Sequence, residues 1–237
     1  MKILSIGNSF SQDAQRYLHE IAKKDGTDLQ VVNLFIGGCS LRTHYLNILG
    51  DKIAYELGYN GQNTGIKVAI KQVLESVEWD VVTLQQASAF SANFETYFPY
   101  MAEIEKYVKI YCPHAKIFIH ETWAYEDGCE RLHSLRFNNA KEMLSNIQES
   151  YKKAKDVIKA DGIIPCGTAM MKALDLGLGK AYRDTYHASL GAGRYLLALT
   201  WYKTFTGKDI SQNDFDAFDE VVTETERKIV IKAVDSI

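Results

Sequence analysis

The sequence predicts an α/β fold, in which helices cover both faces of a parallel sheet. Short runs rich in β-branched and aliphatic residues recur along the chain, and stretches with helical spacing of apolar residues separate them. This alternation is typical of βαβ units, whose strands are parallel. The 237 residues fit one large domain, residues 1–237, because no repeat, low-complexity tract or Pro/Gly-rich linker marks a boundary.

Five runs are predicted to be strands, and they lie at residues 3–6, 29–35, 80–84, 116–120 and 162–165. Apolar residues at helical spacing predict helices between them, within residues 66–77, 101–111 and 143–158. The last strong helix is expected at residues 190–205, which are apolar on most sides. Residues 51–65 differ, because Gly58, Asn60 and Gly61 there indicate a surface hairpin or excursion outside the core.

The composition is that of an ordinary soluble globule. With 27 basic and 30 acidic residues and no charge run, nucleic acid is not an expected partner. No apolar stretch approaches a membrane span and no secretory signal is evident, so we expect a cytoplasmic protein, or a periplasmic or secreted one if a leader has been removed. The cysteines form no CxxC pair, which argues against a disulfide framework or a metal site; they are Cys39, Cys112, Cys129 and Cys166.

The segment "SIGNSFS" at residues 5–11 follows the first predicted strand. Ligands of parallel sheets collect at the carboxyl ends of strands, so this turn is a candidate site. Gly7 permits a tight turn, and a small polar residue after it can cap the next helix. Ser9 has two interpretations: it belongs to an ordinary helix cap, or it is a nucleophile whose side chain faces a cleft at a helix N-terminus.

A nucleophilic serine needs a base, and His187 is the best candidate among six histidines. It ends the segment "RDTYH", in which Asp184 lies three residues upstream. In a tight loop this offset brings the carboxylate to one imidazole nitrogen and leaves the other free to act as a base. The alternative is an exposed pair that caps the following helix.

Together, "GNSFS" near the N-terminus and "DTYH" near the C-terminus resemble the SGNH/GDSL hydrolase superfamily. The likeness is closest to the bacterial branch that begins with Gly-Asn-Ser-Phe-Ser, and it spans nearly the whole chain. The resemblance implies a flavodoxin-like, three-layer α/β/α fold with a parallel five-stranded sheet. It also implies that Ser9 is the nucleophile and that Asp184 and His187 complete a catalytic triad.

The resemblance further implies an oxyanion hole formed by three groups. Beside the Ser9 N–H, the family uses a glycine after the second strand, and in "FIGGCS" Gly38 is the better match. An ordinary Gly-Gly turn is the alternative. The usual Gly-x-Asn-Asp is replaced by "TLQQAS", so Gln85 would supply the side-chain amide, with Gln86 as the fallback. The "GQNT" at 61–64 is rejected because it follows no predicted strand.

"LQQAS" is similar to the "YQGES" of sialate and acetylxylan esterases. This favours a serine esterase that removes short acyl groups, such as acetyl, from a carbohydrate or related small molecule, without a metal or cofactor. Trp123 and Tyr125 follow the fourth strand and could form an aromatic wall for the substrate, although simple packing explains them equally well. The competing function is a non-catalytic, flavodoxin-like carbohydrate-binding module. Nucleotide binding lacks support, because no phosphate-binding loop follows any strand.

Overall fold

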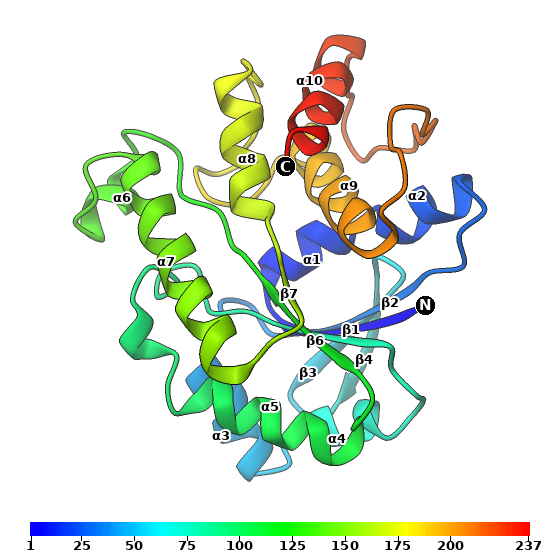
Figure 1. Cartoon of the computed structure of the whole chain (residues 1–237), viewed down its shortest axis with the longest axis vertical. Coiled ribbons are helices and arrows are strands. Elements are labelled where there is room, and N and C mark those ends of the chain that lie inside the picture. The colour runs from blue at the N-terminus through cyan, green and yellow to red at the C-terminus, as the bar shows by residue number, and fades with distance from the viewer.

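The computed structural model describes residues 1–237, and all of its strands join one seven-stranded sheet of order β4-β3-β2-β1-β5-β6-β7 (Figure 1). Five strands run parallel to one another: β1 (Lys2–Gly7), β2 (Gln30–Phe35), β5 (Val81–Leu84), β6 (Lys116–His120) and β7 (Gly162–Ile164). Taken alone, these five have the 2-1-3-4-5 order of flavodoxin-like sheets. The predicted α/β fold class is therefore confirmed.

The sheet has two more strands than the five expected. β3 (Tyr55–Tyr59) and β4 (Gln62–Val68) form an antiparallel hairpin, and β3 pairs with the edge of β2. Asn60 and Gly61 connect them, both at positive φ, as a two-residue hairpin turn requires. Of the two alternatives expected for residues 51–65, the structure forms the hairpin, which begins at Tyr55, continues to Val68 and extends the sheet through β2.

The prediction of a helix within residues 66–77 is wrong for the first residues of that range. Ile66 and Val68 belong to β4, and helix α4 covers only Ile70–Leu74. β4 is an edge strand whose side chains are almost all exposed, so the core imposes no alternating pattern on its sequence. Its apolar residues were therefore taken for the start of the helix that follows.

Helices cover both faces of the sheet (Figure 1). One layer holds α1 (Ser9–Gln15), α2 (Leu18–Lys24), α8 (Cys166–Asp175), α9 (Ala192–Thr206) and α10 (Glu224–Asp235). The other holds α3 (Leu41–Leu49), α4, α5 (Tyr100–Tyr111) and α7 (Ala140–Ile158). Two short helices, α6 (Glu130–Ser134) and the 3₁₀ helix η1 (Phe94–Thr96), lie in the connections. The sequence did not predict α10, which follows the expected last helix and packs on α8 and α9.

The core is continuous, with 63 buried apolar residues in one cluster. α9 lies within it, since most of its residues are buried, which agrees with its apolar character in the sequence. None of the helices combines the length and the hydropathy that crossing a membrane requires.

The topology places the candidate residues together. From β1 the chain passes to β2 on one side, and it later reaches β5 on the other side of β1. Such a reversal of strand order opens a crevice at the carboxyl edge of the sheet. Ser9, Gly38 and Gln85 follow β1, β2 and β5 at this edge.

Candidate active site

Ser9 is the first residue of α1, directly after the turn that leaves β1. The preceding residue, Asn8, is the helix N-cap, and its side-chain oxygen accepts the backbone N–H of Phe10 at 2.9 Å. The capping role that the sequence left open for this segment therefore belongs to Asn8. As the first helical residue, Ser9 has a backbone N–H with no acceptor inside the helix.

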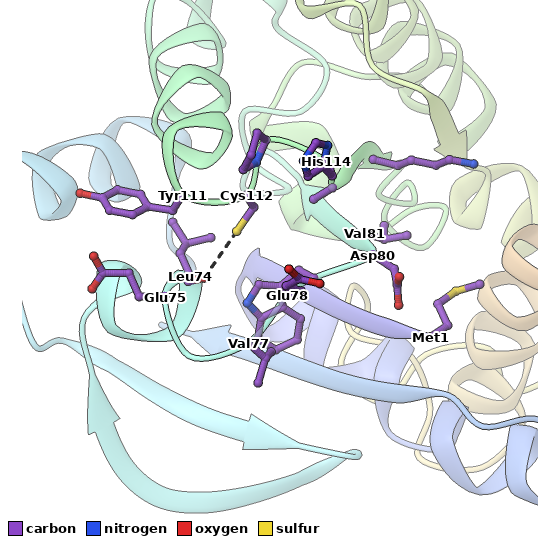
Figure 2. Close-up of a pocket in the computed structure, with 14 residues that line it drawn as sticks. Met1, Leu74, Glu75, Val77, Glu78, Asp80, Val81, Tyr111, Cys112 and His114 are labelled. Carbon is purple, nitrogen blue, oxygen red and sulfur yellow. Dashed lines mark hydrogen bonds between the residues drawn. The ribbon is translucent and has the colours of Figure 1, made fainter.

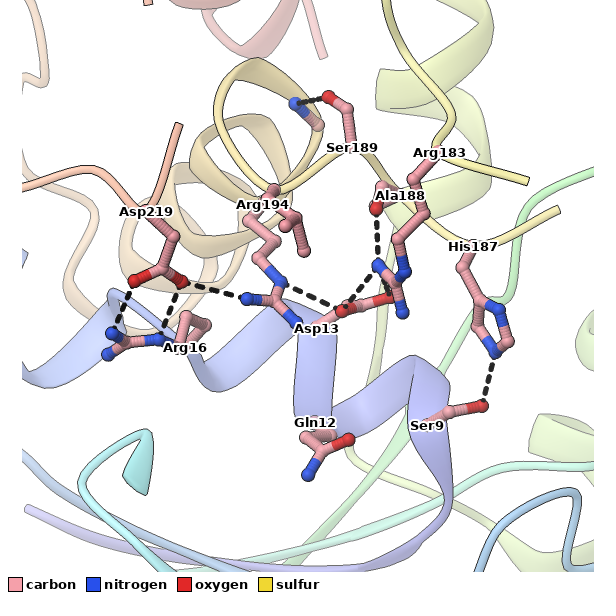
Figure 3. Close-up of polar contacts among 12 residues, drawn as sticks. Ser9, Gln12, Asp13, Arg16, Arg183, His187, Ala188, Ser189, Arg194 and Asp219 are labelled. Atoms are coloured by element: carbon pink, nitrogen blue, oxygen red, sulfur yellow. Dashed lines mark hydrogen bonds and ion pairs between the residues drawn. The ribbon is translucent and has the colours of Figure 1, made fainter. Parts of the chain in front are cut away.

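The structure brings Ser9, His187 and Asp184 into one hydrogen-bonded series (Figure 3 shows the Ser9–His187 contact). Nδ1 of His187 lies 2.7 Å from Oδ2 of Asp184, and Nε2 lies 2.8 Å from Oγ of Ser9. A carboxylate only accepts hydrogen bonds, so Nδ1 carries the proton and Nε2 of the neutral ring accepts the Ser9 hydroxyl. This is the orientation in which an imidazole can remove the proton of a serine hydroxyl.

The loop that carries His187 also fixes the Asp184 carboxylate. Its Oδ1 accepts the backbone N–H of His187 at 2.8 Å, while Oδ2 accepts the ring. Burial raises the pKa of the Asp184 carboxyl, but the hydrogen bonds from the ring and the N–H of His187 together outweigh this effect. The pKa of Asp184 therefore lies below its usual value. Asp184 is thus held ionised beside the imidazole at neutral pH.

Gly38 lies in a tight turn after β2. The N–H of Cys39 donates to the carbonyl of Ile36, and Gly38 has φ of 62°. That conformation at the third position of a turn favours glycine. The N–H of Gly38 itself donates to no protein group. Asn8 Nδ2 donates to the Cys39 carbonyl at 3.1 Å, which ties this turn to the residue before Ser9.

Gln85 connects Asn8 to His120 in a buried chain of hydrogen bonds. Its Nε2 is 2.7 Å from Oδ1 of Asn8, and its Oε1 is 2.7 Å from Nδ1 of His120. Asn8 Oδ1 must accept, because it also binds the Phe10 N–H, so the neighbouring atom of Gln85 must be the donor and His120 must donate to its oxygen. One of the two N–H donors of Gln85 is thereby used on Asn8. The oxyanion role predicted for Gln85 would depend on the second.

Both the oxygen and the nitrogen of the Gln86 side-chain amide form hydrogen bonds within the protein. Oε1 accepts the backbone N–H groups of Leu41 and Ala87, and Nε2 donates to the carbonyl and the hydroxyl of Thr96. Both donors and both acceptor sites therefore have partners within the protein. The structure gives this fallback residue a bracing role between the strand exit and two neighbouring segments.

Trp123 and Tyr125 are fully buried, which favours the packing alternative for both. The Trp123 ring stacks on Phe10, with ring centres 4.1 Å apart, and its Nε1 donates to the carbonyl of Tyr186. The Tyr125 hydroxyl lies 3.0 Å from that of Ser88. The two rings thus support Phe10 and the loop of His187, and neither presents a face to a substrate.

Tyr186 is an aromatic neighbour of the site that the sequence analysis did not select. Its half-buried ring lies 4.0 Å from the His187 ring, centre to centre, and the Arg131 guanidinium lies 4.0 Å from its centre. From the sequence, Asn8 was expected only as one of three possible helix caps, and His120 was not selected as a site residue. The position of Tyr186 directly before His187 in the sequence could have indicated that it lies near the site. The hydrogen bond between His120 and Gln85 could not be predicted in this way, because it depends on the pairing of β6 with β5.

A separate hollow lies away from these residues. It measures about 1,100 Å³ and is lined by residues that precede or begin β1, β5 and β6, among them Met1, Asp80 and His114 (Figure 2). These are the amino ends of the strands, whereas Ser9 follows a carboxyl end. Figure 2 also shows Cys112, whose thiol donates to the carbonyl of Leu74. None of the predicted site residues lines this hollow.

Comparisons with known proteins agree with this architecture. Residues 2–235 match the family described as "Domain of unknown function (DUF4886)". A crystal structure of a DUF4886 family protein from Bacteroides uniformis is 32% identical, with a TM-score of 0.91, over 100% of this chain and 93% of that one. Curated proteins gave no match.

More distant solved structures carry the superfamily name. A candidate SGNH hydrolase from Slackia heliotrinireducens is 25% identical, with a TM-score of 0.63, over 86% of this chain and 98% of that one. An acetylxylan esterase from Geobacillus stearothermophilus is 15% identical, with a TM-score of 0.57, over 86% and 94% of the two chains, and shares the fold. The resemblance read from "GNSFS" and "DTYH" is confirmed at the level of the superfamily. The chain belongs to the DUF4886 family and has the fold of the SGNH hydrolases.

Proposed function

We propose that this protein is a serine hydrolase of carboxylic esters. The observation that carries the proposal is the series Ser9–His187–Asp184, with hydrogen-bond distances of 2.8 and 2.7 Å between side chains that lie up to 178 positions apart in the sequence. A serine, a base and an orienting carboxylate in this order are the parts of a nucleophilic acyl transfer.

In the proposed reaction, the Ser9 oxygen attacks the ester carbonyl while Nε2 of His187 takes its proton. The protonated imidazole is stabilised by Asp184 and then gives the proton to the leaving alcohol. Water, deprotonated by the same ring, attacks the acyl-enzyme and releases the acid and free Ser9. Each proton that leaves a nucleophile thus returns to a leaving group through His187.

The negative charge of the tetrahedral intermediate needs hydrogen-bond donors. The N–H groups of Ser9 and Gly38 are candidates, since the first has no acceptor in its helix and the second donates to no protein group. The second N–H of Gln85 would complete the hole. Removal of one such donor typically costs about 3 kcal/mol of transition-state stabilisation.

The proposed substrates are small esters with a short acyl group, such as acetyl, on a carbohydrate or related polar molecule. Ser9, Tyr186 and His187 are all half-buried, so the nucleophile is partly accessible to solvent. Such a site suits a short acyl group whose alcohol part stays in solvent. The likeness of "LQQAS" to carbohydrate esterases supports the same class.

The test is covalent labelling of Ser9 with a fluorophosphonate, located by peptide mass analysis, together with hydrolysis of p-nitrophenyl acetate. Ser9→Ala and His187→Ala should each lower kcat by on the order of a thousandfold or more, and the double variant should be little worse, because the residues act as a unit. Ser11→Ala is the matched control for labelling, since its hydroxyl is buried and bonded to Asn8 and Asn33. An unlabelled wild type that hydrolyses no ester would instead support the binding-module alternative.

A further inference from the structure

A short loop, residues 183–188, carries both Asp184 and His187 and is closed at its two ends by one arginine. The backbone N–H of Arg183 donates to the carbonyl of His187 at 3.0 Å. Nη1 of the same arginine donates to the carbonyl of Ala188 at 2.5 Å. Arg183 therefore fixes the residues immediately before Asp184 and immediately after His187. We call residues 183–188 the His187 loop.

Arg183 in turn is anchored on the helix that carries the nucleophile (Figure 3). Its Nη1 lies 3.0 Å from Oδ1 and 2.9 Å from Oδ2 of Asp13. Asp13 lies four residues after Ser9 in α1, so the two side chains are one helical turn apart on the same side of the helix. The Asp13 carboxylate thus connects the His187 loop to the helix that presents Ser9.

Burying the charged carboxylate of Asp13 at this position has a free-energy cost. Its side chain is fully buried, and burial raises the pKa of the carboxyl while the guanidinium groups of Arg194 and Arg183 oppose that shift. Nε of Arg194 donates to Oδ1 at 2.9 Å, and Arg194 also reaches Asp219, which pairs with Arg16. The cost of desolvation offsets much of the attraction in such a buried pair, so its net stabilisation is small, while the hydrogen bonds from both arginines fix the position of the carboxylate.

The backbone of the His187 loop shows what this anchoring holds in place. Thr185, between Asp184 and His187, has φ of 71°, a conformation that a β-branched residue adopts only under strain. Its carbonyl accepts the N–H of Glu126 at 2.8 Å. Backbone strain of this kind persists only where the surroundings impose it. The contacts of Arg183 and Glu126 supply that constraint at both sides of Thr185.

We propose that Asp13 and Arg183 form a clamp that positions His187 against Ser9. The proposal rests on the esterase function proposed above, and it assigns positioning roles to two residues that touch neither the substrate nor the reacting atoms. Without the clamp the His187 loop would lose its attachment to α1, and the 2.8 Å contact between Nε2 and the Ser9 hydroxyl would no longer be fixed. Misplacement of a reacting group by about 1 Å can cost on the order of a hundredfold in rate.

The experiment compares two isosteric substitutions in one network. Asp13→Asn removes the charge that holds Arg183, whereas Asp219→Asn removes the charge at the far end, which contacts Arg16 and Arg194 and not the His187 loop. We expect Asp13→Asn to lower kcat for p-nitrophenyl acetate and the rate of fluorophosphonate labelling by about 10- to 100-fold, with KM within twofold. Asp219→Asn should keep both rates within twofold of the wild type.

Arg183 keeps the proposal testable if Asp13→Asn does not fold, because its side chain is partly exposed. Arg183→Gln should lower kcat as Asp13→Asn does, and Arg183→Lys, which keeps the charge beside Asp13, should recover part of the loss. Hydrogen exchange gives a readout that does not need activity: amides of residues 184–188 should exchange faster in Arg183→Gln and not in Asp219→Asn.

Three results would overturn the clamp: kcat within twofold of the wild type in folded Asp13→Asn or in Arg183→Gln, equal losses in Asp219→Asn, or unchanged exchange of residues 184–188. A wild type that neither reacts with the probe nor hydrolyses the ester would reject the esterase function and the catalytic role of the clamp with it. The exchange experiment would then still report whether Arg183 holds the loop, so the two failures can be distinguished.

Discussion

Two buried histidines should make the stability of this protein strongly dependent on pH. His44 and His120 are fully buried, and burial lowers the pKa of each imidazole from 6.5 to about 3. Nδ1 of His44 lies 2.9 Å from the Tyr55 hydroxyl, Nδ1 of His120 lies 2.7 Å from Gln85, and neither Nε2 has a partner. Both rings are therefore neutral in the folded protein at pH values where the unfolded chain protonates them.

The sign of the effect follows from proton binding. Between about pH 3 and 6.5 the unfolded chain binds more protons at these two residues, so the free energy of unfolding falls as the pH falls. At pH 4.5, two units below 6.5, the two histidines together cost about 5 kcal/mol relative to neutral pH, at roughly 1.4 kcal/mol per unit for each. Burial raises the pKa of the carboxyls of Asp13 and Glu121, which opposes part of this loss near pH 4.5.

The assay is urea unfolding at several pH values between 7.5 and 4.5. His44→Asn and His120→Asn are the variants, because Asn removes the titrating ring and its amide offers both a donor and an acceptor to the partner of Nδ1. Each variant should lose stability less steeply with falling pH than the wild type, by about 1.36 kcal/mol per pH unit, which is one proton. His114→Asn, at an exposed histidine, should keep the wild-type slope. Equal slopes in the wild type and both buried variants would refute the reasoning.

Three further substitutions test the site. Gln85→Ala should lower kcat about a hundredfold with KM nearly unchanged if its second N–H meets the oxyanion; a loss of stability with unaltered kcat would show that the amide only holds Asn8. Gly7→Ala places a Cβ 2.1 Å from the Ser11 hydroxyl and should lower the free energy of unfolding by about 1–3 kcal/mol in urea titrations; an unchanged midpoint would contradict the clash. Asp184→Asn should lower kcat by about 10⁴ through loss of the required tautomer, and retained turnover would show that the carboxylate does not orient His187.

The five parallel strands could be predicted from the sequence because most of their residues are buried and apolar. Residues 116–120 are β6 as expected, and the other four parallel strands agree within one or two residues at each end. The hairpin β3–β4 was harder, since its edge strand contacts solvent and its pairing with β2 is a tertiary event. The amphipathic α10 carries a clear capping box at Thr223 and Glu226, a signal that was present but not used.

The candidate site could be predicted only in part. The resemblance to the SGNH/GDSL hydrolases was needed to predict Ser9, Asp184 and His187 as site residues. Their spacing in the sequence is explained equally simply by helix caps. Asp13 and Arg183 have no sequence signature: an aspartate inside a helix and an arginine in a loop are both ordinary surface residues until long-range packing buries one against the other. The chain from His120 to Asn8 likewise depends on β6 lying next to β5.

The separation of Ser9 and His187 along the chain also has a consequence during synthesis. Ser9 is translated 178 residues before its proposed base, which at about 5–20 residues per second corresponds to roughly 10–35 s. Throughout that interval the nascent chain presents a serine hydroxyl of ordinary, unactivated reactivity. In the proposed mechanism, hydrolytic competence would arise only after the segment that carries His187 has been synthesised and packs against α1, so translation products truncated before His187 would lack the proposed base.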